Sequence, residues 1–331
     1  MIKMLFYFTK SILFQENTML LFILALIPVI GLLVFVYLKD RKEKEPIGLL
    51  IALFFAGMAT VITALIGEGV GEAILGVVFP KESVMFQIIS AIFIVGFWEE
   101  IGKFLVLWLI TWKNKHFDYS YDAIVYSIFV SLGFAALENV AYVFSNGVGT
   151  AVARMISAVP GHACFAVFMG FFYSKAKYAS LTKKKGAATK YILLAIIIPV
   201  LVHGVYDAIL MASGATENAA AALGIVLWFG YVIAMFVICF ILVLRSSKND
   251  FCIITSPEKL QTVYRPSVIG SWTCTCGSVN LMNFCPKCGK QRQLVTTWYC
   301  AKCGSPSSLN FCGNCGSPKP VFQPPVQNPV V

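Results

Sequence analysis

Several charged or titratable residues lie inside apolar stretches of the sequence. They are Glu99, Glu100 and Lys103 in FWEEIGKF, Glu138 with Asn139 in GFAALENV, His162 in VPGHACF, and His203 with Asp207 in LVHGVYDA. A charged side chain at the centre of a bilayer costs roughly 2.5–3.5 kcal/mol, so such residues face a protein interior or a wet cavity and mark functional sites. A spacing of three or four residues places Lys103 on the same helix face as Glu99 and Glu100. The same spacing places His203 beside Asp207 on one face of another helix.

A set of carboxylates and imidazoles of this kind can activate a water molecule in two ways. Four carboxylates with one lysine cannot all stay ionised in a low dielectric unless protons or a cation enter. A glutamate can act as general base, with a histidine assisting it or stabilising an oxyanion. Alternatively, histidines and carboxylates hold a divalent metal with an open position, and the metal acidifies the water. Both routes lead to hydrolysis, and the residues leave the choice between them open.

Three of these residues have simpler roles that compete with direct chemistry. Lys103 is expected to act as a counter-ion that keeps a neighbouring glutamate ionised. Asp207 either orients His203 through a hydrogen bond or acts as a ligand itself. Asn139 is expected to hold helices together, since amides hydrogen-bond across membrane helices, with an oxyanion-donor role as the alternative.

The elements that position these residues are long apolar segments. The chain has 331 residues, of which 58% are hydrophobic and 13% charged, and its mean hydropathy is +0.79, so an ordinary soluble protein is excluded. Segments of about 20 apolar residues are long enough to cross the membrane as helices. They lie at 19–38, 47–66, 86–110, 122–145, 157–173, 191–212 and 221–244. We therefore expect an all-α polytopic membrane domain with seven spans over 19–245, preceded by an interfacial segment at 1–18.

The basic residues between these segments predict the orientation. The loops at 39–45, 111–121 and 174–190 contain four, two and six Lys or Arg residues, whereas those at 67–85, 146–156 and 213–220 contain one, one and none. Because positively charged loops stay in the cytoplasm, the N-terminus is expected outside the cell membrane and the C-terminus in the cytoplasm. The polar residues of the spans then converge in the outer half of the bilayer. The net charge of +10 is a topology signal, and no nucleic-acid partner is expected.

The order of the motifs resembles the PrsW family of intramembrane proteases, relatives of the CAAX-processing membrane proteases. The series is EExxK at 99–103, FxxxEN at 134–139, a histidine at 162 and HxxxD at 203–207, within a match over roughly 20–245. The resemblance implies an endopeptidase that cuts a membrane-anchored protein near the outer face, such as an anti-sigma factor. It assigns the catalytic carboxylate to Glu99 and Glu100. It gives Glu138, His162 and His203 water-activating or metal-binding roles, supported by Asp207.

A non-enzymatic membrane protein is the alternative. The same polar residues would suit a proton- or ion-coupled transporter, and a signalling scaffold could keep the fold without activity. The combination of paired carboxylates with two histidines, and the ordered motif match, favour hydrolysis. The sequence shows no broken-helix pair or internal membrane repeat, which argues against transport.

Eight of the eleven cysteines follow the last apolar segment, beyond a polar linker at 246–271. They form two copies of a module, at 272–290 and 298–318, with ligand sets Cys274, Cys276, Cys285 and Cys288, and Cys300, Cys303, Cys312 and Cys315. Four thiolates in two close pairs suit tetrahedral zinc, which a reducing cytoplasm favours over disulfides. We expect two structural zinc ribbons that regulate the enzyme or bind a cytoplasmic protein partner, followed by a disordered, Pro-rich tail at 319–331.

Overall fold

A computed structural model describes the membrane domain in full and the cysteine-rich region in part. The described residues are 18–253, 272–273, 276, 279–280, 288, 298–299, 303, 306–307 and 311–318. The interfacial segment predicted at 1–18 lies outside them, apart from Thr18, and so does the tail at 319–331. The chain divides into two units, Met1–Ile254 and Thr255–Val331, which are described separately.

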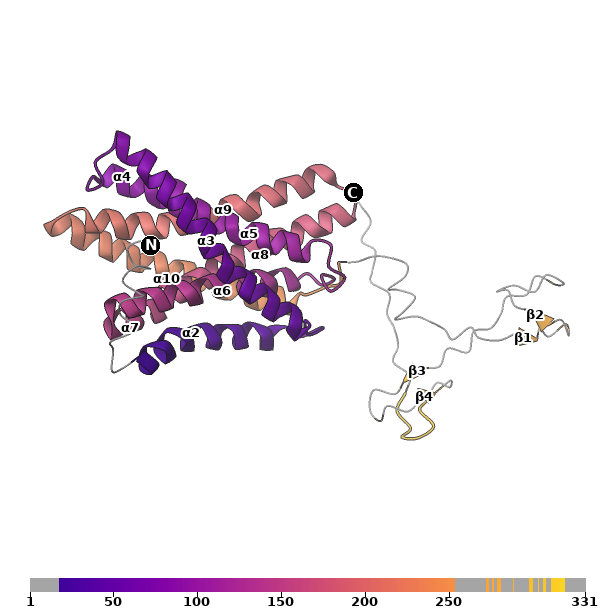
Figure 1. The fold of residues 1–331 in the computed structure, drawn as a ribbon. Helices are drawn as coiled ribbons and strands as arrows, with labels where there is room; N and C mark the ends of the chain where they lie inside the picture. Colours follow the sequence, from indigo (N-terminus) through magenta and orange to yellow (C-terminus); the bar gives the residue numbers. More distant parts are fainter. Residues whose placement is uncertain are drawn as a thin grey trace. The chain divides into compact units, whose positions relative to one another are not determined.

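The first unit is a bundle of long helices (Figure 1). They are α2 (Thr18–Lys39), α3 (Ile47–Val78), α4 (Val84–Ile89), a π-helix (Ser90–Val95), α5 (Gly96–Thr111), α6 (Asp122–Asn146), α7 (Val148–Ile156), α8 (Ala158–Leu181), α9 (Lys185–Gly214) and α10 (Asn218–Lys248). Within the described residues, seven helical passes are long and apolar enough to cross a membrane, with α4, the π-helix and α5 forming one pass and α7 with α8 another. The predicted all-α, seven-span fold is confirmed.

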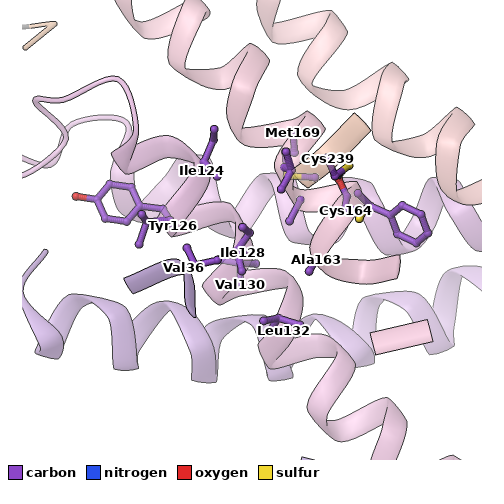
Figure 2. Close-up of a cluster of buried hydrophobic side chains, with 14 of the residues drawn as sticks. Val36, Ile124, Tyr126, Ile128, Val130, Leu132, Ala163, Cys164, Met169 and Cys239 are labelled. Atoms are coloured by element: carbon purple, nitrogen blue, oxygen red, sulfur yellow. Dashed lines mark hydrogen bonds between the residues drawn. The ribbon is translucent and has the colours of Figure 1, made fainter. Parts of the chain in front are cut away.

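Helix α6 is the centre of this unit. In the most apolar 18-residue window of α6, 94% is buried inside the protein. The buried share of the same kind of window is 22% in α2 and 22% in α10. The side chains of α6 contribute Ile124, Ile128 and Val130 to the main hydrophobic core, where they lie near Cys164 of α8 and other labelled side chains (Figure 2). The outer helices therefore present most of their surface to lipid, and α6 contacts mainly protein.

Glycines let α3 approach α6 closely. A Cβ atom on Gly57 of α3 would lie 2.0 Å from the carbonyl oxygen of Val130, and one on Gly133 of α6 would lie 2.0 Å from the carbonyl oxygen of Phe54. Since no other residue fits at either position without moving backbone, the two helices are held at a distance that only glycine permits.

Helix α3 is longer than its apolar segment predicts. It continues past the expected end at 66 to Val78, through a stretch that contains two glutamates and four glycines, GEGVGEAILG. The stretch remains helical because it packs on the next pass, where a Cβ on Gly67 would meet the Trp98 ring at 2.1 Å. Tertiary packing thus extends the helix beyond the part that hydrophobicity alone identifies.

Residues after α10 return to the helix bundle. The N–H of Ile253 donates to the carbonyl oxygen of Asp118 at 2.7 Å, and Cys252 forms an antiparallel bridge with Tyr119. The first unit therefore continues to Ile254, past residue 246, where the change in composition predicts the start of a linker.

The described part of the second unit contains two small hairpins. Strand β1 (Trp272–Thr273) pairs antiparallel with β2 (Val279–Asn280), and β3 (Trp298–Tyr299) pairs with β4 (Pro306–Ser307). Trp272 lies opposite Asn280 and Trp298 opposite Ser307, so each cysteine module begins with a similar hairpin. This agrees with the internal repeat seen in the sequence.

Candidate active site

Four passes bring the predicted site residues into one buried layer. Glu99, Glu100 and Lys103 come from α5, Glu138 from α6, His162 from α8, and His203 with Asp207 from α9. Glu100 and Lys103 are fully buried, whereas the Asp207 side chain is 21% exposed. The residues that the sequence singles out therefore do lie together.

Local helix irregularities precede two of these groups. The π-helix at Ser90–Val95 ends immediately before α5, which contributes Glu99, and such segments often occur at functional sites because they alter the direction of the side chains that follow. Helix α9 contains Pro199, one turn before His203. Proline cannot donate the backbone hydrogen bond to residue 195, so α9 is locally weakened beside the site.

Lys103 connects the two glutamates of α5 with a histidine of α8. Its Nζ lies 2.7 Å from Glu100 Oε1, 3.1 Å from Glu99 Oε2 and 3.3 Å from His162 Nδ1. The ammonium group also lies 4.1 Å from the centre of the Phe134 ring. The sequence predicts a counter-ion for either glutamate, and the structure shows Lys103 paired with both.

Both ring nitrogens of His203 face carboxylates. Nδ1 lies 3.0 Å from Glu100 Oε1, and Nε2 lies 3.2 Å from Asp207 Oδ2. The Phe165 ring stacks on the imidazole with centroids 4.3 Å apart. The position and orientation of His203 are thus fixed on three sides, with Asp207 placed as an orienting carboxylate would be.

Glu138 joins His162 to Arg154, a residue that the sequence places only in a loop. Its Oε2 lies 2.9 Å from His162 Nε2 and accepts a hydrogen bond from Arg154 Nη2 at 2.7 Å. Arg154 belongs to the short helix α7, and its Nε donates to Asn139 Oδ1 at 2.8 Å. The Asn139 amide also donates to the carbonyl oxygen of Ala25 at 2.8 Å, so it links α6 to α2 as predicted for a residue that holds helices together.

A second residue near the layer, the acidic Glu68, also lies outside the predicted spans. Glu68 of α3 is 9% exposed, and its Oε1 atom is buried without a hydrogen-bond partner among the described residues. Its carboxylate lies within electrostatic reach of Glu99 and Glu138. The signal was present in the sequence, but the apolar segment that defined the span ended before residue 68.

The layer has a donor set that fits a divalent metal ion. Glu99, His162 and His203 each offer one ligand atom, and the three atoms lie within 4.8 Å of one another. Two imidazoles and one carboxylate with a further open position are typical of catalytic zinc. Among the described residues, the layer has five carboxylates and two fixed cations, Lys103 and Arg154. The carboxylates are those of Glu99, Glu100, Glu138, Asp207 and Glu68, and this excess of negative charge also favours a cation.

In the cysteine region, Cys303, Cys312 and Cys315 offer sulfur atoms within 4.8 Å of one another. These are three of the four ligands predicted for the second zinc ribbon. Cys300 lies outside the described residues, as do Cys274 and Cys285 of the first ribbon, whose Cys276 and Cys288 are described.

Comparison with known proteins identifies the family. Residues 45–243 match the profile of the PrsW family intramembrane metalloproteases. The chain belongs to the PrsW family. Proteins named Protease PrsW from Geobacillus kaustophilus and Bacillus subtilis are 39% and 37% identical to it over 185 and 186 residues, which is 56% of this chain and 77% and 80% of theirs. The Clostridioides difficile protein of the same name is 35% identical over 196 residues, 58% of this chain and 79% of its own.

Family membership decides between the two classes of function left open by the sequence. The protein is a multi-pass membrane protease, as preferred over the transporter and scaffold alternatives. The matched region contains every residue of the buried layer, Glu68 and Arg154 included, whereas both cysteine modules lie beyond it. No solved structure matches this chain.

Proposed function

We propose that the buried layer hydrolyses a peptide bond of a membrane-anchored protein, and that Glu99, His162 and His203 hold a catalytic divalent metal. The convergence of their three ligand atoms within 4.8 Å carries this proposal. Such an ion would polarise the carbonyl of the scissile bond and acidify a bound water. The family's description as metalloproteases supports the metal route over a glutamate acting alone.

Glu100 is the best-placed general base. Its Oε1 atom accepts a hydrogen bond from Lys103 Nζ at 2.7 Å, while its buried Oε2 has no hydrogen-bond partner among the described residues. The first oxygen fixes the carboxylate in place, and the second can accept a proton from the attacking water. Glu100 would then return this proton to the leaving amine nitrogen.

The remaining residues orient the reacting groups. Asp207 holds His203 through Nε2, and Glu138 holds His162 through Nε2, at 3.2 and 2.9 Å. Carboxylates that hydrogen-bond ligating or catalytic histidines fix the ring position and tautomer. Arg154 fixes Glu138 in turn, so that two successive hydrogen-bonding groups position the His162 imidazole.

The site is proposed to face the outer leaflet. Glu138 lies eight residues before the end of α6 at Asn146, or about 12 Å along the helix axis. Of the two basic residues counted in the loops on that side, Arg154 pairs with Glu138 inside the protein, which leaves Lys81 as the only basic residue of the described loops there. The bias of positive charge toward the opposite side is therefore stronger than counted, and it supports an external N-terminus and cytoplasmic ribbons.

The cysteine modules are proposed to be two structural zinc ribbons with a cytoplasmic protein partner. The convergence of three thiols in the second module supports the metal. Modules of this size bury too little apolar surface to fold alone, so zinc would supply much of their folding free energy.

The test uses the full chain in detergent with a membrane-anchored reporter and elemental analysis of bound metal. We expect three metal ions per chain, two ions after His203→Ala, and three after the control His116→Ala, which changes a histidine outside the layer. Glu100→Gln should abolish cleavage while keeping all three ions. Wild-type cleavage by Glu100→Gln would refute its role as base. An unchanged metal content in His203→Ala with cleavage lost would refute the intramembrane metal and leave the glutamate mechanism.

A further inference from the structure

A cavity of about 660 Å³ lies at the far ends of α8, α9 and α10 from the acidic layer. Its size is within the roughly 300–1,000 Å³ of ordinary ligand pockets. Three basic residues line it, Lys175 of α8, Lys184 in the turn before α9, and Arg245 of α10. The cavity therefore combines two cations from the end of α8 and the turn after it with a third from α10.

The lining changes from apolar to cationic along the helices. Phe171 precedes Lys175 on α8, and Leu242 precedes Arg245 on α10, so that each cation lies closer to the C-terminal end of its helix. The apolar residues thus lie deeper in the span, and the cations lie nearer its end. This is the polarity profile of a phospholipid at the membrane interface, with its head group outermost.

The cations have no acidic neighbours in the lining. No Asp or Glu lines the cavity, and none of the three basic residues forms an ion pair within the described part of the chain. Asp250, between the lining residues Asn249 and Phe251, has other partners, since its Oδ1 accepts from Ser120 Oγ at 2.7 Å and from the Tyr121 N–H at 2.8 Å. Within the described residues, no ion pair neutralises the positive charge of the cavity.

Two further features favour an anion in this cavity. Helix α9 begins at Lys185 without a side-chain cap, so its first N–H groups and the positive end of its dipole face the region of Lys184 and Ala187. Lys175 Nζ lies 4.4 Å from the centre of the Phe171 ring and 5.8 Å from that of Tyr191. The two rings fix the ammonium group at the wall of the cavity.

We propose that this cavity binds the phosphodiester head group of an anionic phospholipid, with Lys175, Lys184 and Arg245 around the phosphate and the acyl chains along Phe171 and Leu242. If these basic residues served only to set the orientation of the protein in the membrane, they would need charge but no cavity between helices. This site is independent of the catalytic roles proposed above, because it lies on other residues.

The test measures lipid binding to the full chain in detergent by native mass spectrometry. The probes are dioleoyl-phosphatidylglycerol, dioleoyl-phosphatidylcholine and the soluble head-group analogue glycerol 3-phosphate. At about fivefold per cation, the triple variant Lys175→Gln, Lys184→Gln, Arg245→Gln should lose about a hundredfold in affinity for phosphatidylglycerol. The control triple Lys113→Gln, Lys115→Gln, Lys190→Gln makes the same change in charge outside the cavity and should bind as the wild type does.

Three outcomes would overturn the proposal. The wild type could show no preference for phosphatidylglycerol over phosphatidylcholine. Both triple variants could lose affinity equally, which would indicate a diffuse electrostatic effect. Glycerol 3-phosphate could displace the lipid completely, which would indicate a soluble phosphate ligand. If the cavity triple variant does not fold, the single variant Arg245→Gln decides, with an expected loss of about fivefold against none for Lys190→Gln.

Discussion

Replacing Arg154 tests whether α7 takes part in the site. In Arg154→Gln, Glu138 loses a charged hydrogen bond of 2.7 Å, and the 2.8 Å bond from Arg154 to Asn139 is lost as well. The Arg154 side chain is only 14% exposed, so water can replace its lost hydrogen bonds only poorly. Hydrogen bonds to charged groups contribute about 1.5–3 kcal/mol each.

If one such bond serves to hold Glu138 and hence His162 in the reactive orientation, kcat should fall by about 10- to 150-fold. KM should change little, because Arg154 contacts Glu138 and Asn139 and acts on the reaction only through them. Arg154→Lys keeps the charge but not the two-pronged geometry, so it should restore part of the lost rate. Lys81→Gln, which removes a basic residue from a loop on the same side, should leave kcat and KM unchanged.

The assay is cleavage of a membrane-anchored reporter in detergent, with kcat and KM determined separately and folding checked by thermal unfolding. A folded Arg154→Gln protein with the wild-type kcat would refute the reasoning. So would a loss confined to KM, which would place Arg154 in substrate binding and not in the positioning of His162.

Three further predictions follow from other parts of the structure. Gly133→Val should destabilise the protein by at least about 1–3 kcal/mol, because its Cβ would meet the Phe54 carbonyl at 2.0 Å, whereas Gly149→Ala, with open space around it, should leave thermal unfolding unchanged. Burial raises the pKa of Asp40 to about 6 and that of Glu45 to about 7. The folded state therefore binds more protons than the unfolded chain between about pH 4 and 7, so the unfolding temperature should fall as the pH rises through 6–7, and a flat profile would contradict this. Cys315→Ser should remove one zinc per chain in elemental analysis, and an unchanged zinc content would exclude Cys315 as a ligand.

The number and order of spans could be predicted from the sequence because hydrocarbon imposes one requirement on every crossing segment, a run of apolar residues of sufficient length. The convergence of Glu99, His162 and His203 was predictable for a related reason. Polar groups that cannot face lipid must face one another or an interior cavity.

The two missed residues show where this reasoning ends. Arg154 lies between two apolar stretches, so a count of loop charges treats it as exposed, and only the packing of α7 brings it to Glu138. Glu68 lies after the apolar segment, on a part of α3 that is helical because it packs on the following pass. In both cases tertiary contacts, which single-sequence periodicity does not contain, decide the position.

The central place of α6 has a consequence for how the protein enters the membrane. The two helices most exposed to lipid, α2 and α10, have mean hydropathies of 3.1 and 2.8, whereas α6 reaches only 1.7. Helices such as α2 and α10 insert on their own hydrophobicity, but α6 contains Glu138 and Asn139 and depends more on neighbours that satisfy its polar groups. A helix that carries part of the site is thus among the least able to insert alone. A chain interrupted during synthesis before α7 would leave these polar groups of α6 without Arg154 and His162. Quality-control proteases would then be expected to meet a poorly inserted segment instead of a partial enzyme.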